Sequence, residues 1–245
     1  MSRHPNLVRG FTLIEMGIAL FIVVLVLGSM LVPLSAQVEQ RQTRATLQEL
    51  DEIREALVGF ALAKGYLPCP DQTSGAGSND GSEDINAGTG ACSVVLTTSG
   101  NDFSMGNVPW VTLGLGSRDP WGNRYRYFVL SNFAQRSPAT PFTLGTADNL
   151  RVCETAACTT TLSTTAVAVV LSHGTNGYGA INASSGTANT APVSADELEN
   201  TDADRDIVSR PRYSGGLDAS EFDDIVVWLS RYTLFNRMVS GGKLP

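Results

Sequence analysis

Arg9-Gly10-Phe11-Thr12-Leu13-Ile14-Glu15 opens an apolar run in which no charged residue follows Glu15 until Glu39. A helix over residues 11–33 would be about 35 Å long at about 1.5 Å per residue, enough to cross a hydrocarbon core of roughly 30 Å. An acid inside such a span is unfavourable by roughly 2.5–3.5 kcal/mol. The stretch therefore predicts a transmembrane helix and assembly segment over residues 11–34, with a functional role for Glu15 opposite a positive partner.

The string G-F-T-L-I-E, preceded by Arg9, resembles the leader signal of type IV pilins and type II secretion pseudopilins. The resemblance implies that a prepilin peptidase removes the leader, residues 1–10, by cleaving between Gly10 and Phe11, and that the new terminus is methylated. It also implies that Glu15 faces the terminal amine of a neighbouring subunit, since pairing offsets the penalty of burying either charge alone. The alternative is an ordinary signal peptide or signal anchor, whose apolar core would be shorter and whose cleavage site would follow that core.

The resemblance further implies an α+β, pilin-like fold. A long N-terminal helix, transmembrane in its first half, would pack on a C-terminal antiparallel β-sheet domain over residues 65–245. Residues 35–64 have the amphipathic pattern of a continued helix, and Gly65 suits its C-terminal cap. The apolar stripe recurs at spacings of three and four: Leu50, Ile53, Leu57 and Phe60.

Charge and topology restrict the partners. The chain has 17 Lys and Arg against 24 Asp and Glu, a net charge of −7, and no basic cluster, which argues against nucleic acid. Arg3 and Arg9 precede the apolar run and indicate a cytoplasmic N-terminus. With the resemblance, this predicts a single-pass protein of the bacterial inner membrane, its C-terminal domain periplasmic, that can be extracted into a periplasmic or surface filament. The implied partners are prepilin peptidase, other pilin or pseudopilin subunits, an inner-membrane assembly platform and membrane lipid.

The four cysteines are Cys69, Cys92, Cys153 and Cys158. In an oxidising compartment they allow three pairings, of which we favour Cys69–Cys92 and Cys153–Cys158. Closing these loops would contribute about 3.5 and about 2 kcal/mol. A zinc site is the alternative, but the C-x4-C spacing and a single His in the mature chain do not favour it.

The β-strand signals lie in the second half of the chain. Strands are predicted at 125–129, 150–153, 166–172 and 222–229, with a short closing helix, whereas residues 68–107 read as a long irregular loop stapled by Cys69–Cys92. The string D-P-W-G-N-x-Y-x-Y, which begins at Asp119, resembles the start of the sheet in the major pseudopilin. Trp110 and Trp121 are interpreted as core and turn anchors, with an aromatic ligand platform as the alternative.

An acidic loop is the candidate site in the sequence. The carboxylates assigned to it are Asp196, Glu199, Asp202, Asp204, Asp206, Asp223 and Asp224. Calcium takes about six to eight oxygen ligands, and major pseudopilins, which the chain resembles, bind it in a loop between late strands. The loop is not an EF-hand, because Ile207 and Tyr213 stand where that loop needs Gly and Glu. A solvated acidic loop without a metal ion is the alternative.

The sequence lacks the signatures of an enzyme. It contains neither a G-x-S-x-G nor a P-loop, and His173 is interpreted as a turn residue with a satisfied hydrogen bond. We therefore predict a structural subunit, a minor pilin or pseudopilin of a type IV pilus or type II secretion filament, assembled through its N-terminal helix after leader cleavage. The alternatives are a major filament subunit and a membrane-tethered periplasmic binding protein that uses the segment as an anchor.

Overall fold

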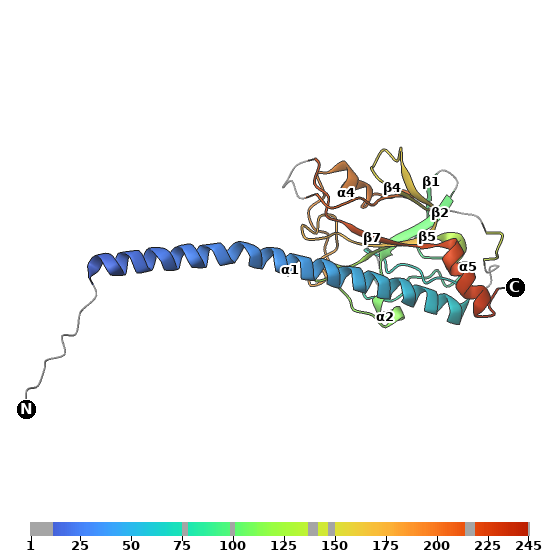
Figure 1. The fold of residues 1–245 in the computed structure, drawn as a ribbon. Coiled ribbons are helices and arrows are strands. Elements are labelled where there is room, and N and C mark those ends of the chain that lie inside the picture. The colour runs from blue at the N-terminus through green and yellow to red at the C-terminus, as the bar shows by residue number, and fades with distance from the viewer. Residues whose placement is uncertain are drawn as a thin grey trace, which may run out of the picture. The chain divides into compact units, whose positions relative to one another are not determined.

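A computed structural model describes residues 12–74, 78–98, 101–136, 142–146, 150–213 and 219–244, apart from the side chains of residues 28–36 and 101. Contacts divide the chain into two units, residues 1–43 and 44–245. Each unit is described by itself, with the elements as labelled in Figure 1.

The helices and strands follow in chain order. The helices are α1 (Leu13–Lys64), α2 (Trp110–Leu113), α3 (Ser131–Ala134), α4 (Ala195–Glu199) and α5 (Arg231–Ser240). The strands are β1 (Leu96–Thr98), β2 (Asn101–Asn107), β3 (Arg126–Leu130), β4 (Leu150–Cys153), β5 (Thr161–Ser172), β6 (Asp206–Val208) and β7 (Ile225–Ser230).

The end of α1 and its inward face follow from local sequence. Gly65 has a φ of +89°, and its N–H donates to the carbonyl of Ala61 at 2.7 Å, which confirms the predicted cap. Phe60, predicted in the stripe, is only half-buried, because Ala61 lies one helical turn beyond Leu57 and takes the inward position. The buried positions of the helix within the second unit are Thr46, Leu50, Ile53, Leu57, Val58 and Ala61.

The prediction of a transmembrane first half is wrong. No helix among the described residues is both long enough and apolar enough to cross a membrane. This finding also overturns the single-pass inner-membrane location, which was built on that segment.

The prediction of an antiparallel sheet is also wrong, because the sheet is mixed. Its strand order is β1-β2-β3-β5-β4-β6, with β7 paired to β5. The pairs are antiparallel except β4 and β6, which run parallel with Arg151 opposite Asp206 and Cys153 opposite Val208. The long connection between β5 and β6 allows this, since parallel strands need a crossover rather than a tight turn. The fold is therefore a mixed α/β arrangement.

Part of the predicted irregular loop forms the strands β1 and β2, which pair with each other in antiparallel fashion. β2 lies within residues 68–107 and pairs with β3, so that Phe103 faces Leu130 and Gly106 faces Tyr127. A Cβ on Gly106 would approach the carbonyl oxygen of Asp71 to 2.4 Å, so this strand needs a glycine there. A close contact between segments that are distant in the sequence produces no periodic pattern, so the strand could not be predicted from the sequence.

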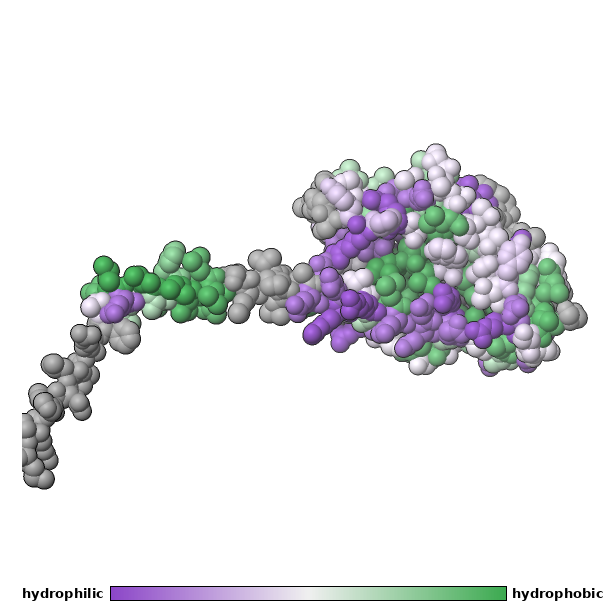
Figure 2. All heavy atoms as spheres, viewed as in Figure 1, coloured by the Kyte–Doolittle hydropathy of each residue, from purple (hydrophilic) through white to green (hydrophobic). Residues whose placement is uncertain are grey.

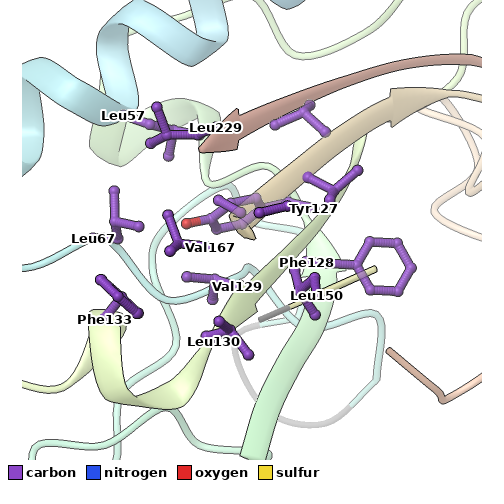
Figure 3. Close-up of a cluster of buried hydrophobic side chains, with 14 of the residues drawn as sticks. Leu57, Leu67, Tyr127, Phe128, Val129, Leu130, Phe133, Leu150, Val167 and Leu229 are labelled. Carbon is purple, nitrogen blue, oxygen red and sulfur yellow. The ribbon is translucent and has the colours of Figure 1, made fainter. Parts of the chain in front are cut away.

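The core of the second unit lies on both faces of β3. Figure 3 shows Tyr127 and Val129 on the side where Leu57 of α1 and Leu67 converge, with Phe128 directed toward Leu150. Tyr127 also donates its hydroxyl to the carbonyl oxygen of Pro68 at 3.1 Å. Because the sheet is covered on both faces, β3 lacks the polar alternation of a half-buried strand.

Both disulfides that we favoured are present. Cys69 and Cys92 are joined with their Cα atoms 5.3 Å apart, and Cys153 and Cys158 with theirs 5.1 Å apart. Both separations lie in the usual range for a disulfide. The first bond ties the chain just after α1 to the segment before β1, and the second closes the turn between β4 and β5.

Candidate functional site

The acidic segment folds into α4 and β6 and then meets the start of β7. Three of its carboxylates, Glu197, Asp223 and Asp224, are 1%, 4% and 7% exposed. One carboxylate oxygen from each lies within 4.8 Å of the others. We call these three residues the buried triad. They place like charges close together where little water can screen them, which disfavours the fully ionised state.

Two asparagines hold the buried triad in place. Asn176 donates its backbone N–H to Oδ2 of Asp223 at 2.8 Å and its amide to Oε1 of Glu197 at 3.1 Å. Asn200 donates to Oδ2 of Asp224 at 2.7 Å and exchanges two bonds with the backbone of Val208. The triad thus lies between the loop after β5, the short α4 and the strand β6. Three separate stretches of the sequence build it.

His173 and Arg126 form the other side of the triad. The Nε of Arg126 donates to Nε2 of His173 at 3.2 Å, so that a neutral ring carries its proton on Nδ1. That Nδ1 lies 3.4 Å from Oδ1 of Asp224. Burial lowers the pKa of the Arg126 guanidinium to about 10, and Asp224 opposes that shift. His173 directly follows β5 and begins a turn, as predicted, because its carbonyl accepts from the N–H of Gly177 at 3.1 Å; its side chain is fully buried.

Oδ1 of Asp223 is buried and accepts no hydrogen bond within the described ranges, whereas Oδ1 of Asp224 faces Nδ1 of His173. Burial, and secondarily the charge of Asp224, raise the pKa of Glu197 to about 7, and burial raises the pKa of Asp223 to about 6. An unpartnered carboxylate oxygen beside two further acids suits a hard cation such as calcium, which neutralises the charges and occupies the vacant acceptor.

The remaining predicted ligands do not join this triad. Glu199, Asp202 and Asp204 form a second, more exposed group with oxygens within 4.8 Å of one another. Burial first, and then Asp204, raise the pKa of Glu199 to about 7. The group lacks the buried framework of the triad, so its residues can separate in water.

Two predicted ligands are engaged elsewhere. Asp196 pairs with Arg210 at 2.7 Å, and Asp206 forms a bidentate pair with Arg151 on the neighbouring strand. Such charge-assisted pairs already satisfy these carboxylates. The structure therefore does not bring the predicted ligands together in one place. Chain folding splits them into the buried triad, the exposed group and two ion pairs.

Glu197 is not among the ligands predicted from the sequence. Its neighbours Asp196 and Glu199 are partly exposed, whereas Glu197 is buried because α4 turns this position toward β6 and the start of β7. No local periodicity separates it from its neighbours. Its proximity to Asp223 and Asp224 follows from the folded structure alone.

Stability at neutral pH is expected to depend on the buried triad. Because the folded pKa of Glu197 is raised from 4.5 to about 7, the fold holds its proton more tightly than the unfolded chain does. The contribution of Glu197 to stability is then fully present below about pH 4.5 and is lost as pH rises through about 7. Thermal midpoints in a chelating buffer should fall over this window, and Glu197→Gln should reduce the slope. An unchanged slope in that variant would contradict the assignment.

The other predicted functional residues lie at the start of the chain. Gly10 and Phe11 are outside the described residues. Thr12 and Glu15 form a capping box: Oγ1 of Thr12 accepts from the N–H of Glu15 at 3.3 Å, and Oε2 of Glu15 accepts from the N–H of Thr12 at 2.8 Å. Glu15 therefore has a local role in starting α1. The T-x-x-E spacing could have revealed that role in the sequence.

The comparisons with known proteins add no relative. No family model matches the chain, and no curated protein or solved structure matches it either.

Proposed function

We propose that this chain is a subunit of a pilin-type filament, assembled through the first part of α1 after removal of residues 1–10. The supporting observation is the surface of residues 12–27, in which every side chain is exposed. Apart from Thr12, Glu15 and Gly17, these side chains are apolar. Exposed apolar surface of this extent marks an interaction site.

The distribution of this surface favours several partners over one. Residues 18–27 are uninterrupted apolar positions, and consecutive positions point in all directions around a helix that has about 3.6 residues per turn. Figure 2 shows this apolar character along the described side chains of the segment. One neighbouring helix covers one face, whereas a bundle of helices covers all of them. Repeated addition of subunits supplies such a bundle.

Glu15 supports the same proposal. Its carboxylate is exposed and close to the start of the helix, where the resemblance puts a neighbour's terminal amine. Prepilin peptidase, related subunits and an assembly platform are the proposed partners. We favour a minor subunit, because the long connection between β5 and β6 and the acidic α4 segment would crowd a uniform lattice. A major subunit is the alternative, and genes for a secretin and an assembly ATPase beside this one would identify the machine.

The assembly proposal predicts that Glu15→Val is processed but incorporates poorly. Leader removal is read by intact mass, as a chain that begins at Phe11. Incorporation is measured by crosslinking the subunits of sheared filaments with a reagent that does not react with cysteine. We expect the incorporated fraction to fall by about tenfold, equivalent to about 1.4 kcal/mol. The reason is loss of a charge pair with the neighbouring subunit's amine.

Thr12→Ala is the matched control, because it disrupts the capping box and keeps the carboxylate. It should incorporate within about twofold of the parent protein, since losing a cap lowers helix stability by only about 1 kcal/mol. Equal loss in both variants would mean that Glu15 acts through capping alone. Normal incorporation of Glu15→Val would contradict the charge-pairing account.

A second function, cation binding by the buried triad, is favoured by one specific observation. Oδ1 of Asp223 is buried among carboxylates and has no hydrogen-bond partner in the described part of the chain. Glu197, Asp223 and Asp224 would hold the ion, with Asn176 and Asn200 orienting their carboxylates. The ion would order the loop between α4 and β7 by cancelling the repulsion within the triad.

Calcium should raise the thermal midpoint of the processed protein relative to chelator. At about 100 times the Kd the stabilisation is about 2.7 kcal/mol, or a shift of about 5–10 °C for a unit of this size. Glu197→Gln should abolish the shift, and Glu154→Gln, which removes an exposed acid elsewhere, should preserve it. Identical midpoints with calcium and with chelator would exclude the ion.

A further inference from the structure

A cavity of about 480 Å³ lies where the turn before β3 meets the loop after β5. Its walls are tied together by backbone bonds. The N–H of Arg124 donates to the carbonyl of Ile181 at 2.8 Å, and the N–H of Ala183 donates to that of Gly122 at 2.9 Å. The volume lies within the range of small-ligand pockets, about 300–1,000 Å³. These bonds hold the cavity open before any ligand arrives, which lowers the entropic cost of binding.

Two asparagines, Asn123 and Asn189, are among the residues that line the cavity. Asn189 donates its amide to Oδ1 of Asn123 and to the carbonyl of Gly177, both at 2.9 Å. Gly177 has a φ of +61°, and a Cβ there would approach Nδ2 of Asn123 to 2.5 Å, so glycine is required beside this amide. Nδ2 of Asn123 and Oδ1 of Asn189 have no partner among the described residues. These two lining residues thus keep one donor and one acceptor that no described group uses.

The walls combine aromatic rings with uncharged polar groups. Trp121 and Tyr178 are half-buried and line the cavity with Asn182. Nε1 of Trp121 is buried and has no hydrogen-bond partner within the described ranges. None of the described residues that line the cavity carries a charge. A charged ligand would therefore lose its hydration without gaining a counter-charge, which disfavours it.

We propose that this cavity binds a neutral saccharide. A sugar ring offers hydroxyls that donate and accept, which matches asparagine amides with one free group of each kind. It also has an apolar C–H face, which can pack on an indole or phenol ring. The cavity is built only from residues of the 44–245 unit, so the binding does not depend on the proposed assembly through residues 12–27.

The test uses the full chain in a detergent without a sugar head group, since an alkyl glycoside would compete. Maltose, lactose, cellobiose and diacetylchitobiose are titrated, with Trp fluorescence and saturation-transfer NMR as readouts. At least one should bind saturably with a Kd below about 1 mM. A sulfated disaccharide of similar size should bind at least about tenfold more weakly, because the cavity lining has no cation.

Two variants locate the binding. Tyr178→Ala removes a wall, and Ala188→Arg fills the cavity from an exposed position without deleting a native contact. Each should weaken binding by about tenfold or more, whereas Tyr232→Ala, an exposed tyrosine on α5, should stay within about twofold. Near-UV circular dichroism checks that each variant is folded. Absence of saturable binding by all the neutral sugars, binding that survives both variants, or equal binding of the sulfated sugar would overturn the proposal.

Discussion

Leu57→Ala is expected to lower the free energy of unfolding of the 44–245 unit by about 2–5 kcal/mol. Leu57 is fully buried and lies against Leu229 of β7 in the core between α1 and the sheet (Figure 3). Truncation removes apolar burial and leaves a cavity, because the neighbouring strands are held by their ladders and can collapse only in part. The midpoint of urea unfolding, followed by Trp fluorescence, measures the loss.

Leu47→Ala is the matched control for this prediction. Leu47 lies in the same helix, carries the same side chain and is 44% exposed. The substitution improves helix propensity slightly and opens no buried space, so we expect a change within about 0.5 kcal/mol. Similar losses in the two variants would mean that the second half of α1 does not pack on the sheet through the Leu57 face.

Removing the Cys69–Cys92 bond is expected to destabilise the fold by about 3.5 kcal/mol. The bond closes a loop with a sequence separation of 23, and the chain between its ends contains the turns that precede β1. Without the bond the unfolded chain gains the entropy of that loop, while the native contacts stay the same. Thermal and urea unfolding of the Cys69→Ser, Cys92→Ser double variant measure the difference.

The second disulfide supplies an internal comparison. Cys153 and Cys158 have a sequence separation of 5, so their double serine variant should lose only about 2 kcal/mol. Alkylation and intact mass confirm which bond is missing in each protein. A larger loss from the short loop than from the long one would show that native packing, rather than loop closure, determines these energies.

Several elements could be predicted because their signals are local. The α1 stripe at Leu50, Ile53 and Leu57 and the cap at Gly65 follow from helical periodicity and from the freedom of glycine at positive φ. The β-branched runs located β4 and β7 to within a few residues. β2 was missed, because its polar residues form a strand only when β3 is beside them.

The sequence predicted which kind of residue forms the candidate site, but not how these residues are arranged in space. The sequence shows that acids gather between residues 196 and 224, but not which carboxylates share a buried space. Asp206 forms an ion pair with Arg151, and Asp196 forms one with Arg210. Glu197 is buried, although no pattern in the sequence indicated this. The amide and aromatic cavity joins residues from two distant loops, so it too was absent from the sequence as a site.

The sequence by itself determined what depends on neighbours a few residues apart: the stripe and cap of α1, the runs of strand formers and the apolar surface of residues 12–27. Tertiary structure alone decided the mixed sheet, the buried triad and the cavity beside Trp121. The physical reason is that burial and ion pairing depend on which distant segments come into contact. These contacts are determined by the free energy of the whole chain and not by the conformational preference of any short stretch.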